Sequence, residues 1–306
     1  MYEPLPTTTF RHSEDLVTPM DEDIEIHQYV PLAYVRNFSE KTDSPLHIYC
    51  LDKITNIASQ VEIAKITVDE YFYDAEREVS ESIAHLLGGF ESTFNAAYAK
   101  LLEHEDVNAL REDEIRSLRF FMAAQEVRTI KFREKISEMA RQLYLGLSPE
   151  RLPTKLREEL EQAKTPVFAR DVQINSVAKT VPMLTEIMSE MKWILFVNKT
   201  NLLYWTSDHP VCRFNPMGPM RYGNFGLRTP GVQIFFPLNP KLSLTVCDPQ
   251  IYHFYPSKCE ITDQQYVMFQ NRLQITSATR HVLSSNADFS LAKTMLSDPV
   301  ELNSSQ

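Results

Sequence analysis

Apolar residues recur at helical spacing through the middle of the chain, between about residues 80 and 146. The segment ESIAHLLGGFESTFNAAYAKLL, residues 81–102, predicts one helix with a kink at its two adjacent glycines. The segment EDEIRSLRFFMAAQEVRTIKFREKISEMARQLYLG, residues 112–146, predicts a longer one. Its three leading acidic residues suit a helix N-terminus and Gly146 suits its end, so the middle of the chain is expected to be helical.

Shorter apolar segments with strand character flank this helical region. LHIYCLD, residues 46–52, predicts a strand before the helices. KWILFV, the turn NKTN and LLYWTSDHP, residues 192–210, together predict a β-hairpin. GVQIFFPLNPKLSLTVCD, residues 231–248, predicts a second strand pair with a tight PLNP turn. A last helix is expected from about residue 262 to 285.

The order of these elements points to a fold class. Helices cluster in the middle of the chain and most strands follow them, which is typical of an α+β protein rather than of alternating βαβ units. We therefore expect a central helical bundle packed against antiparallel hairpins in a single large domain, residues 26–286. A disordered acidic tail, residues 1–25, is expected before it and a C-terminal tail, residues 287–306, after it.

The net charge of the chain excludes few classes of binding partner. The formal net charge is -10, but residues 1–26 hold seven acidic residues against Arg11 alone, so the rest of the chain is only mildly acidic. Non-specific binding of nucleic acid through a basic face is therefore not indicated. A locally positive pocket remains compatible with this composition.

Several well-known site classes are missing from the sequence. The seven glycines form neither a GxGxxG nor a P-loop pattern, and the four cysteines form no CxxC pair that would suggest zinc or a redox dithiol. Reduced, buried thiols are the simpler interpretation. No stretch of 18 apolar residues occurs and the opening lacks the apolar segment of a secretory signal, so we expect a cytoplasmic protein without a membrane span.

Two segments concentrate polar and aromatic side chains. HQYVPLAYVRNF, residues 27–38, places His27 just before a short helix started by Pro31, and Tyr34 and Phe38 lie four apart on the face expected to be buried. On the long helix, Gln125 and Thr129 fall within the apolar stripe, with Arg128 at its edge. Buried polar groups need partners, so these residues become candidates for a site.

Five motifs in order resemble the domain of unknown function 4238 family, which is found in bacteria and fungi: HQYVPLAYVRNF, QEVRTIKFRE, WTSDHP, FFPLNPKLSL and NRLQITSATRHVLSS. The resemblance covers about residues 26–286. It picks out His27, Pro31, Tyr34, Phe38, Gln125, Arg128, Thr129, Ser207, Asp208, Pro210, Pro237 and Asn271. The family often has asparagine where this chain has His209, so His209 receives no family role. The family brings no established activity.

Our leading hypothesis from these residues is a phosphodiester or phosphoryl hydrolase, nuclease-like, with nucleic acid or a nucleotide as its partner. His27 would act as acid and base, Arg128 would stabilise negative charge in the transition state, and Asp208 would orient. Gln125, Thr129 and Asn271 would bind the substrate. No metal site and no cofactor are assigned.

The alternative is a non-catalytic binding or interaction module. The same polar network would then recognise an anionic ligand or serve the structure, with His27 capping the short helix and Arg128 in a buried salt bridge with Asp208. Metal chelation by His27, Asp208 and His209 has no diagnostic spacing. Ser207 lacks the sequence context of a nucleophile elbow.

Overall fold

The computed structural model describes residues 26–28, 30–39, 45–66, 68–70, 92–147, 152–163, 165–218 and 226–297. The acidic tail expected over residues 1–25 and the first part of the helix expected over residues 81–102 lie outside these ranges. Helical structure is present over residues 92–104. The expected α+β single-domain fold is confirmed, because helices and mostly antiparallel sheets share one large hydrophobic core.

The largest sheet has five strands in the order β10 (Lys258–Ile261), β5 (Lys192–Asn198), β9 (Leu242–Cys247), β8 (Gln233–Asn239) and β7 (Cys212–Phe214). β10 pairs parallel to β5 and the other neighbours pair antiparallel. The predicted strand pair over residues 231–248 is confirmed as β8 and β9. These central strands are apolar on both faces, which fits a sheet covered on two sides.

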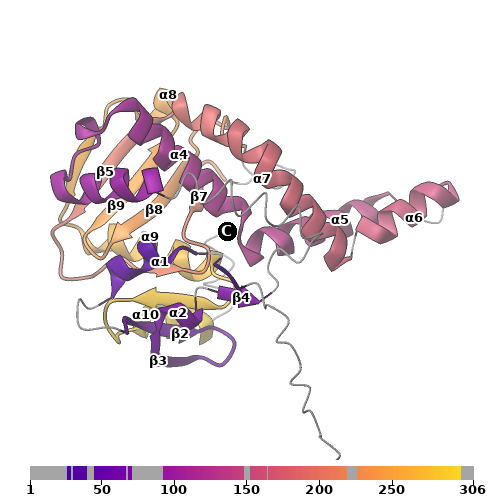
Figure 1. The fold of residues 1–306 in the computed structure, drawn as a ribbon, viewed down its shortest axis with the longest axis horizontal. Helices are drawn as coiled ribbons and strands as arrows, with labels where there is room; N and C mark the ends of the chain where they lie inside the picture. The colour runs from indigo at the N-terminus through magenta and orange to yellow at the C-terminus, as the bar shows by residue number, and fades with distance from the viewer. Residues whose placement is uncertain are drawn as a thin grey trace, which may run out of the picture.

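Helices cover both faces of this sheet. α4 (Glu112–Val127) and α7 (Pro166–Ser189) lie across one face, where they share the main core with alternate residues of β5, β8 and β9 (Figure 1). α9 (Gln264–Ser277) packs against the other face, where Leu273 joins Phe235 of β8 and Gln270 accepts a 2.5 Å hydrogen bond from Ser243 of β9. The two-residue period of the strands thus divides the core into two layers.

A second sheet has four strands in the order β3 (Ile57–Glu62), β2 (His47–Asp52), β11 (His281–Ser284) and β6 (Thr206–Ser207), all antiparallel. The strand predicted over residues 46–52 is confirmed as β2. A third, two-stranded sheet pairs β1 (Ile26–Gln28) with β4 (Val68–Glu70). The remaining short elements are α1 (Leu32–Val35), η1 (Arg36–Phe38), α2 (Ile63–Ile66), η2 (Val107–Ala109) and α8 (Pro249–Tyr252).

α5 (Ile130–Gly146) and α6 (Thr154–Ala163) run away from the sheets and pack beside the N-terminal part of α7 (Figure 1). Gly146 ends α5, as the sequence predicts. Among the described residues, every helix is too short or too polar to cross a membrane.

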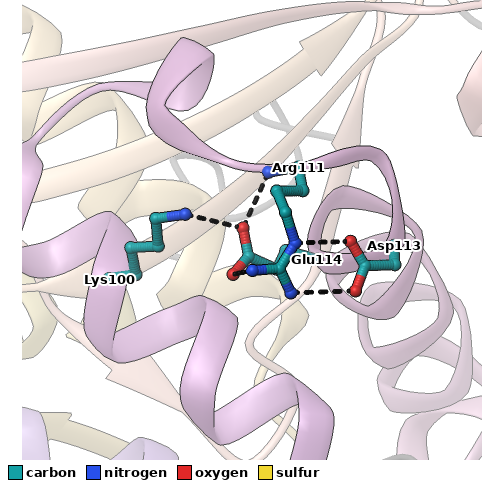
Figure 2. A network of polar contacts seen from close by, with 4 residues as sticks. All are labelled: Lys100, Arg111, Asp113 and Glu114. Atoms are coloured by element: carbon teal, nitrogen blue, oxygen red, sulfur yellow. Dashed lines mark hydrogen bonds and ion pairs between the residues drawn. The ribbon is translucent and has the colours of Figure 1, made fainter.

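The N-terminus of α4 is fixed by a polar network (Figure 2). A carboxylate oxygen of Glu114 accepts the Arg111 N–H at 2.7 Å and Lys100 Nζ at 2.9 Å. The guanidinium of Arg111 donates two 3.0 Å hydrogen bonds to the carboxylate of Asp113. These bonds satisfy a donor at the helix start and place negative charge at the positive end of the helix dipole, so the predicted start at residue 112 is confirmed.

Tyr34 and Phe38 are fully buried, as expected, with 0% of each side chain exposed. Their rings meet edge to face with centroids 5.5 Å apart. The Tyr34 ring also stacks on Phe236 of β8 at 5.0 Å. The short helix over residues 32–38 is therefore anchored in the main core by aromatic packing.

The hairpin predicted over residues 192–210 is wrong. β5 pairs with β9 and β10, whereas β6 joins the other sheet beside β11. The chain between them is not a strand, because the side-chain amide of Asn271 binds the backbone there: Oδ1 accepts the Trp205 N–H and Nδ2 donates to the Leu203 carbonyl, each at 2.9 Å.

The expected C-terminal boundaries also need correction. The helix expected to end near residue 285 ends at Ser277, and the chain then forms β11. The folded part continues past residue 286, where a tail was expected, into α10 (Ser290–Ser297). The apolar residues Phe289, Ala292 and Met295 are buried against Leu51, Trp205 and Val282, and this burial offsets the entropy of ordering the segment.

The burial of Phe38 gives a first prediction. Phe38→Ala should lower the free energy of unfolding by about 3–5 kcal/mol, because it leaves a cavity among aromatic neighbours. Denaturant melts followed by circular dichroism measure the change. Phe254→Ala is the matched control, since Phe254 is 67% exposed, and it should cost less than about 1 kcal/mol. A loss below about 1 kcal/mol for Phe38→Ala would contradict the core assignment.

Candidate functional site

The single long helix predicted over residues 112–146 is broken into α4 and α5 at Arg128 and Thr129. The break needs partners for carbonyls that a continuous helix would bond internally. Gln173 of α7 supplies them: its Nε2 donates to the Val127 carbonyl at 2.7 Å and to the Thr129 carbonyl at 3.0 Å. The two halves of the helix can therefore leave in different directions without a buried, unsatisfied carbonyl.

Gln125 and Arg128 form a pair at this break. Arg128 Nε donates a 2.8 Å hydrogen bond to Gln125 Oε1, and the guanidinium carbon lies 5.6 Å from the centroid of the Phe121 ring. Both side chains are buried, with 0% and 2% exposed. The cation therefore lies in the interior, held by an amide and an aromatic face.

Thr129 links the break to the TSDHP turn, residues 206–210, whose first two residues form β6. Its hydroxyl lies 2.7 Å from Nδ1 of His209, and both side chains are buried. Burial lowers the pKa of His209 well below its ordinary value, and the positive charges of Lys135, Lys131 and Arg213 lower it further. The imidazole is therefore neutral at physiological pH.

The carboxylate of Asp208 binds the backbone at the start of β11. It accepts the backbone N–H groups of Thr279 at 2.8 Å, Arg280 at 2.7 Å and His281 at 2.8 Å. Burial raises the pKa of Asp208, and the three N–H donors oppose that rise. The salt bridge with Arg128 that the binding alternative invoked is replaced by these three amides.

Asn271 also acts on the backbone. As described above, both ends of its side-chain amide bind the segment before β6, and the side chain is 0% exposed. One helical turn further along α9, Gln274 accepts a 2.7 Å hydrogen bond from Ser207 and donates at 2.9 Å to the Pro210 carbonyl. Two amides of α9 thus hold the TSDHP turn from both sides.

His27 lies in β1, where it pairs with Asp69 of β4 in antiparallel register. It therefore belongs to the two-stranded sheet that precedes α1. The expectation that His27, Arg128 and Asp208 form one polar cluster stays a prediction. The structure does bring Gln125, Arg128 and Thr129 together, and it joins them to the turn of Asp208 through His209.

Sequence reasoning missed two residues of this network. Gln173 is a buried polar residue between the apolar positions of α7, the same signal that identified Gln125. His209 was set aside because the family often carries asparagine there. An asparagine could also hydrogen-bond a threonine hydroxyl, so the position serves the same contact in either form.

A pocket of about 560 Å³ lies beside the break, between α5 and α7. Its charged wall consists of Arg133, Glu134, Glu138, Arg141 and Arg170. The Nε of Arg133 donates to Gln173 Oε1, so the amide that bonds the broken helix also holds this wall. We call it the α5–α7 pocket.

Within the described ranges, His, Cys, Asp and Glu side chains do not gather in groups of three or more that could hold a metal ion. The four cysteines are free, with Cys50, Cys212 and Cys247 buried and Cys259 partly buried.

A family model described as "Protein of unknown function (DUF4238)" matches residues 27–288. Neither the curated proteins nor the solved structures include a match. The family match covers both the TSDHP turn and the helix break.

The role of Asp208 generates a stability prediction. Asp208→Asn should lower the free energy of unfolding by about 3 kcal/mol, because an amide group replaces a buried, charged acceptor that serves three backbone N–H groups. Chemical denaturation measures the loss. Asp171→Asn on the exposed side of α7 is the matched control and should stay within about 0.5 kcal/mol. A loss below about 1 kcal/mol for Asp208→Asn would be incompatible with this role.

The burial of His209 predicts a pH dependence. In the unfolded chain a histidine takes up a proton near pH 6.5, whereas folded His209 stays neutral, so stability falls as the pH falls below about 6.5. His209→Asn should reduce the loss between pH 7 and pH 5 by about 2 kcal/mol, measured by denaturant melts at each pH. His104→Asn, at an exposed position, should leave the loss unchanged. Equal slopes for wild type and His209→Asn would refute the burial argument.

Proposed function

This chain belongs to the family of proteins of unknown function (DUF4238), and we propose that it is a non-catalytic binding module for an anionic ligand. One observation carries the proposal: Asp208 and Asn271, two of the polar residues selected for the site, bond to the backbone of the chain itself. The carboxylate of Asp208 serves three backbone N–H groups, and the amide of Asn271 serves a backbone N–H and a carbonyl.

These hydrogen bonds to the backbone argue against a catalytic or substrate-binding role for Asp208 and Asn271. A group that orients a base or binds a substrate must have a donor or acceptor directed at that partner within about 2.6–3.2 Å. Asp208 and Asn271 direct theirs at backbone groups, and turning them toward a ligand would remove the partners of those groups. They are better suited to holding the framework.

The arginine side chains of the α5–α7 pocket support an anionic ligand. Three of its five charged side chains are arginines, whose planar guanidinium groups suit carboxylate and phosphate oxygens. The polar network contributes indirectly, because Gln173 connects Arg133 to the helix break. In this proposal the network maintains the shape of the pocket and takes no part in a reaction.

A phosphodiester or phosphoryl hydrolase is the second candidate, with His27, Arg128 and Asp208 as catalytic residues. The contact that favours it is the 2.7 Å approach of the Thr129 hydroxyl to the neutral imidazole of His209. A hydroxyl beside a neutral imidazole is the arrangement that activates a nucleophile. Nucleic acid or a nucleotide would be the substrate.

We also propose a cytoplasmic location for either function. Its support is the free state of the four cysteines.

Binding and turnover assays distinguish the two functions. We expect the purified full chain to bind at least one of RNA, single-stranded DNA, adenosine monophosphate and citrate, more weakly at high salt, and to turn over none of the phosphate compounds with magnesium, manganese or EDTA. Fluorescence titration and chromatography of the products measure the two results.

Two outcomes would contradict the binding proposal. Binding of none of these anions would remove its basis. Turnover that disappears in His27→Ala and Arg128→Met, while both variants keep the circular dichroism spectrum of the wild type, would establish the hydrolase instead.

A further inference from the structure

β10 is the outer strand of the five-stranded sheet, and its inner side pairs parallel with β5. The Lys199 N–H, at the end of β5, donates to the Ile261 carbonyl of β10 at 2.9 Å. Backbone groups of successive residues in a strand point to opposite sides, so Lys258 and Glu260 direct theirs away from β5. Among the described residues, no strand pairs with this outer side.

The side chains of β10 alternate between the two faces of the sheet. Lys258 and Glu260 are exposed on one face. Cys259 and Ile261 lie partly buried on the other, against the apolar cluster that contains Phe196 of β5. An edge strand with open backbone groups and a partly exposed apolar side is a template for pairing with another chain.

Both charged residues of β10 have an opposite charge beside them in their own chain. Lys258 Nζ lies 3.4 Å from a carboxylate oxygen of Glu105, and Lys199 Nζ lies 3.4 Å from a carboxylate oxygen of Glu260. The four side chains are 40–62% exposed, so water screens these pairs and further partners can approach. Their charges cancel, so the edge is locally neutral in a chain of net charge -10.

We propose that the outer side of β10 binds a second copy of this chain, with the two β10 strands antiparallel about a twofold axis through Cys259. A twofold axis brings the same strand to both sides and closes the assembly at two copies. Residues opposite each other in such a ladder direct their backbone groups either both toward the partner strand or both away, so the axis must pass through a residue. This dimer goes beyond the proposed function and does not depend on the ligand.

The charges of β10 select the register. With the axis at Cys259, Lys258 of each copy lies opposite Glu260 of the other, and the two residues exchange both of their backbone hydrogen bonds. An axis at Lys258 or at Glu260 would place like charges opposite each other, which is destabilising. In the register through Cys259, the ion pairs that each copy already has join into rows of alternating sign across the interface.

The same register brings Cys259 opposite its own copy. The two residues form a pair without backbone hydrogen bonds between them, in which the Cα atoms are about 4.5 Å apart. This distance is within the range that a disulfide spans. Cys50, Cys212 and Cys247 are buried, so a cross-link between two folded chains reports on Cys259.

Sedimentation equilibrium of the full chain with a reductant tests the dimer. We expect a monomer–dimer equilibrium with a Kd of about 1–100 μM, because a short ladder makes a small interface. Lys258→Glu and Glu260→Lys should each raise the Kd at least about tenfold, since each makes both facing pairs alike in charge. Lys155→Glu, at an exposed position of α6, is the matched control and should change the Kd less than about twofold.

A mixture of the two charge variants separates the interface from misfolding. Every facing pair between Lys258→Glu and Glu260→Lys is again opposite in charge, so the equimolar mixture should regain the wild-type Kd within about threefold. A wild-type chain that stays monomeric at about 500 μM would overturn the proposal. A dimer with the same Kd in wild type and both variants would place the interface elsewhere and overturn it as well.

Cross-linking tests the register. Air oxidation catalysed by copper phenanthroline should join two wild-type chains through a disulfide, and Cys259→Ser should abolish this product on non-reducing electrophoresis. A dimer that responds to the charge variants but forms no such disulfide would overturn the axis through Cys259.

Discussion

The fold depends on the hydroxyl of Tyr34, which joins the two large sheets. It donates a 2.8 Å hydrogen bond to the Pro237 carbonyl of β8 and lies 2.7 Å from the Thr206 hydroxyl of β6. Since a carbonyl only accepts, Thr206 is the donor in the second contact. The ring beneath this hydroxyl is fully buried among Phe38, Phe121 and Phe236. A polar contact between the sheets is thus enclosed by aromatic packing, which fixes their relative position.

Polar side chains also bind the backbone at three places where the described part of the chain departs from regular structure. Gln173 bonds the broken helix, Asp208 gathers three N–H groups before β11, and Asn271 holds the backbone before β6. Each provides hydrogen-bond partners for backbone groups that are not paired within a helix or strand there. This common role explains why residues that resemble a catalytic set form a framework, and why we look for the ligand in the neighbouring pocket.

The sequence predicted regular elements better than the places where they end. β2, β8 and β9 follow from local apolar patterns. The break at Arg128 and Thr129 contains neither glycine nor proline, and the side chain that bonds its carbonyls, Gln173, lies 44 residues after Thr129. The end of α9 likewise depends on Asp208, more than 70 residues earlier. Burial of Gln125, Arg128 and Thr129 could be predicted from helical spacing, but their partners come from contacts that no local pattern records.

A double-mutant cycle between Tyr34→Phe and Thr206→Val tests the central claim most directly, because it isolates the contact between the sheets from the packing of the ring. The free energies of unfolding of the wild type, both single variants and the double variant should give a coupling of about 1 kcal/mol. Tyr34→Phe combined with Thr185→Val, whose hydroxyl bonds to the Val181 carbonyl within α7, should be additive. Additivity within about 0.3 kcal/mol for the Tyr34 and Thr206 pair would contradict the account.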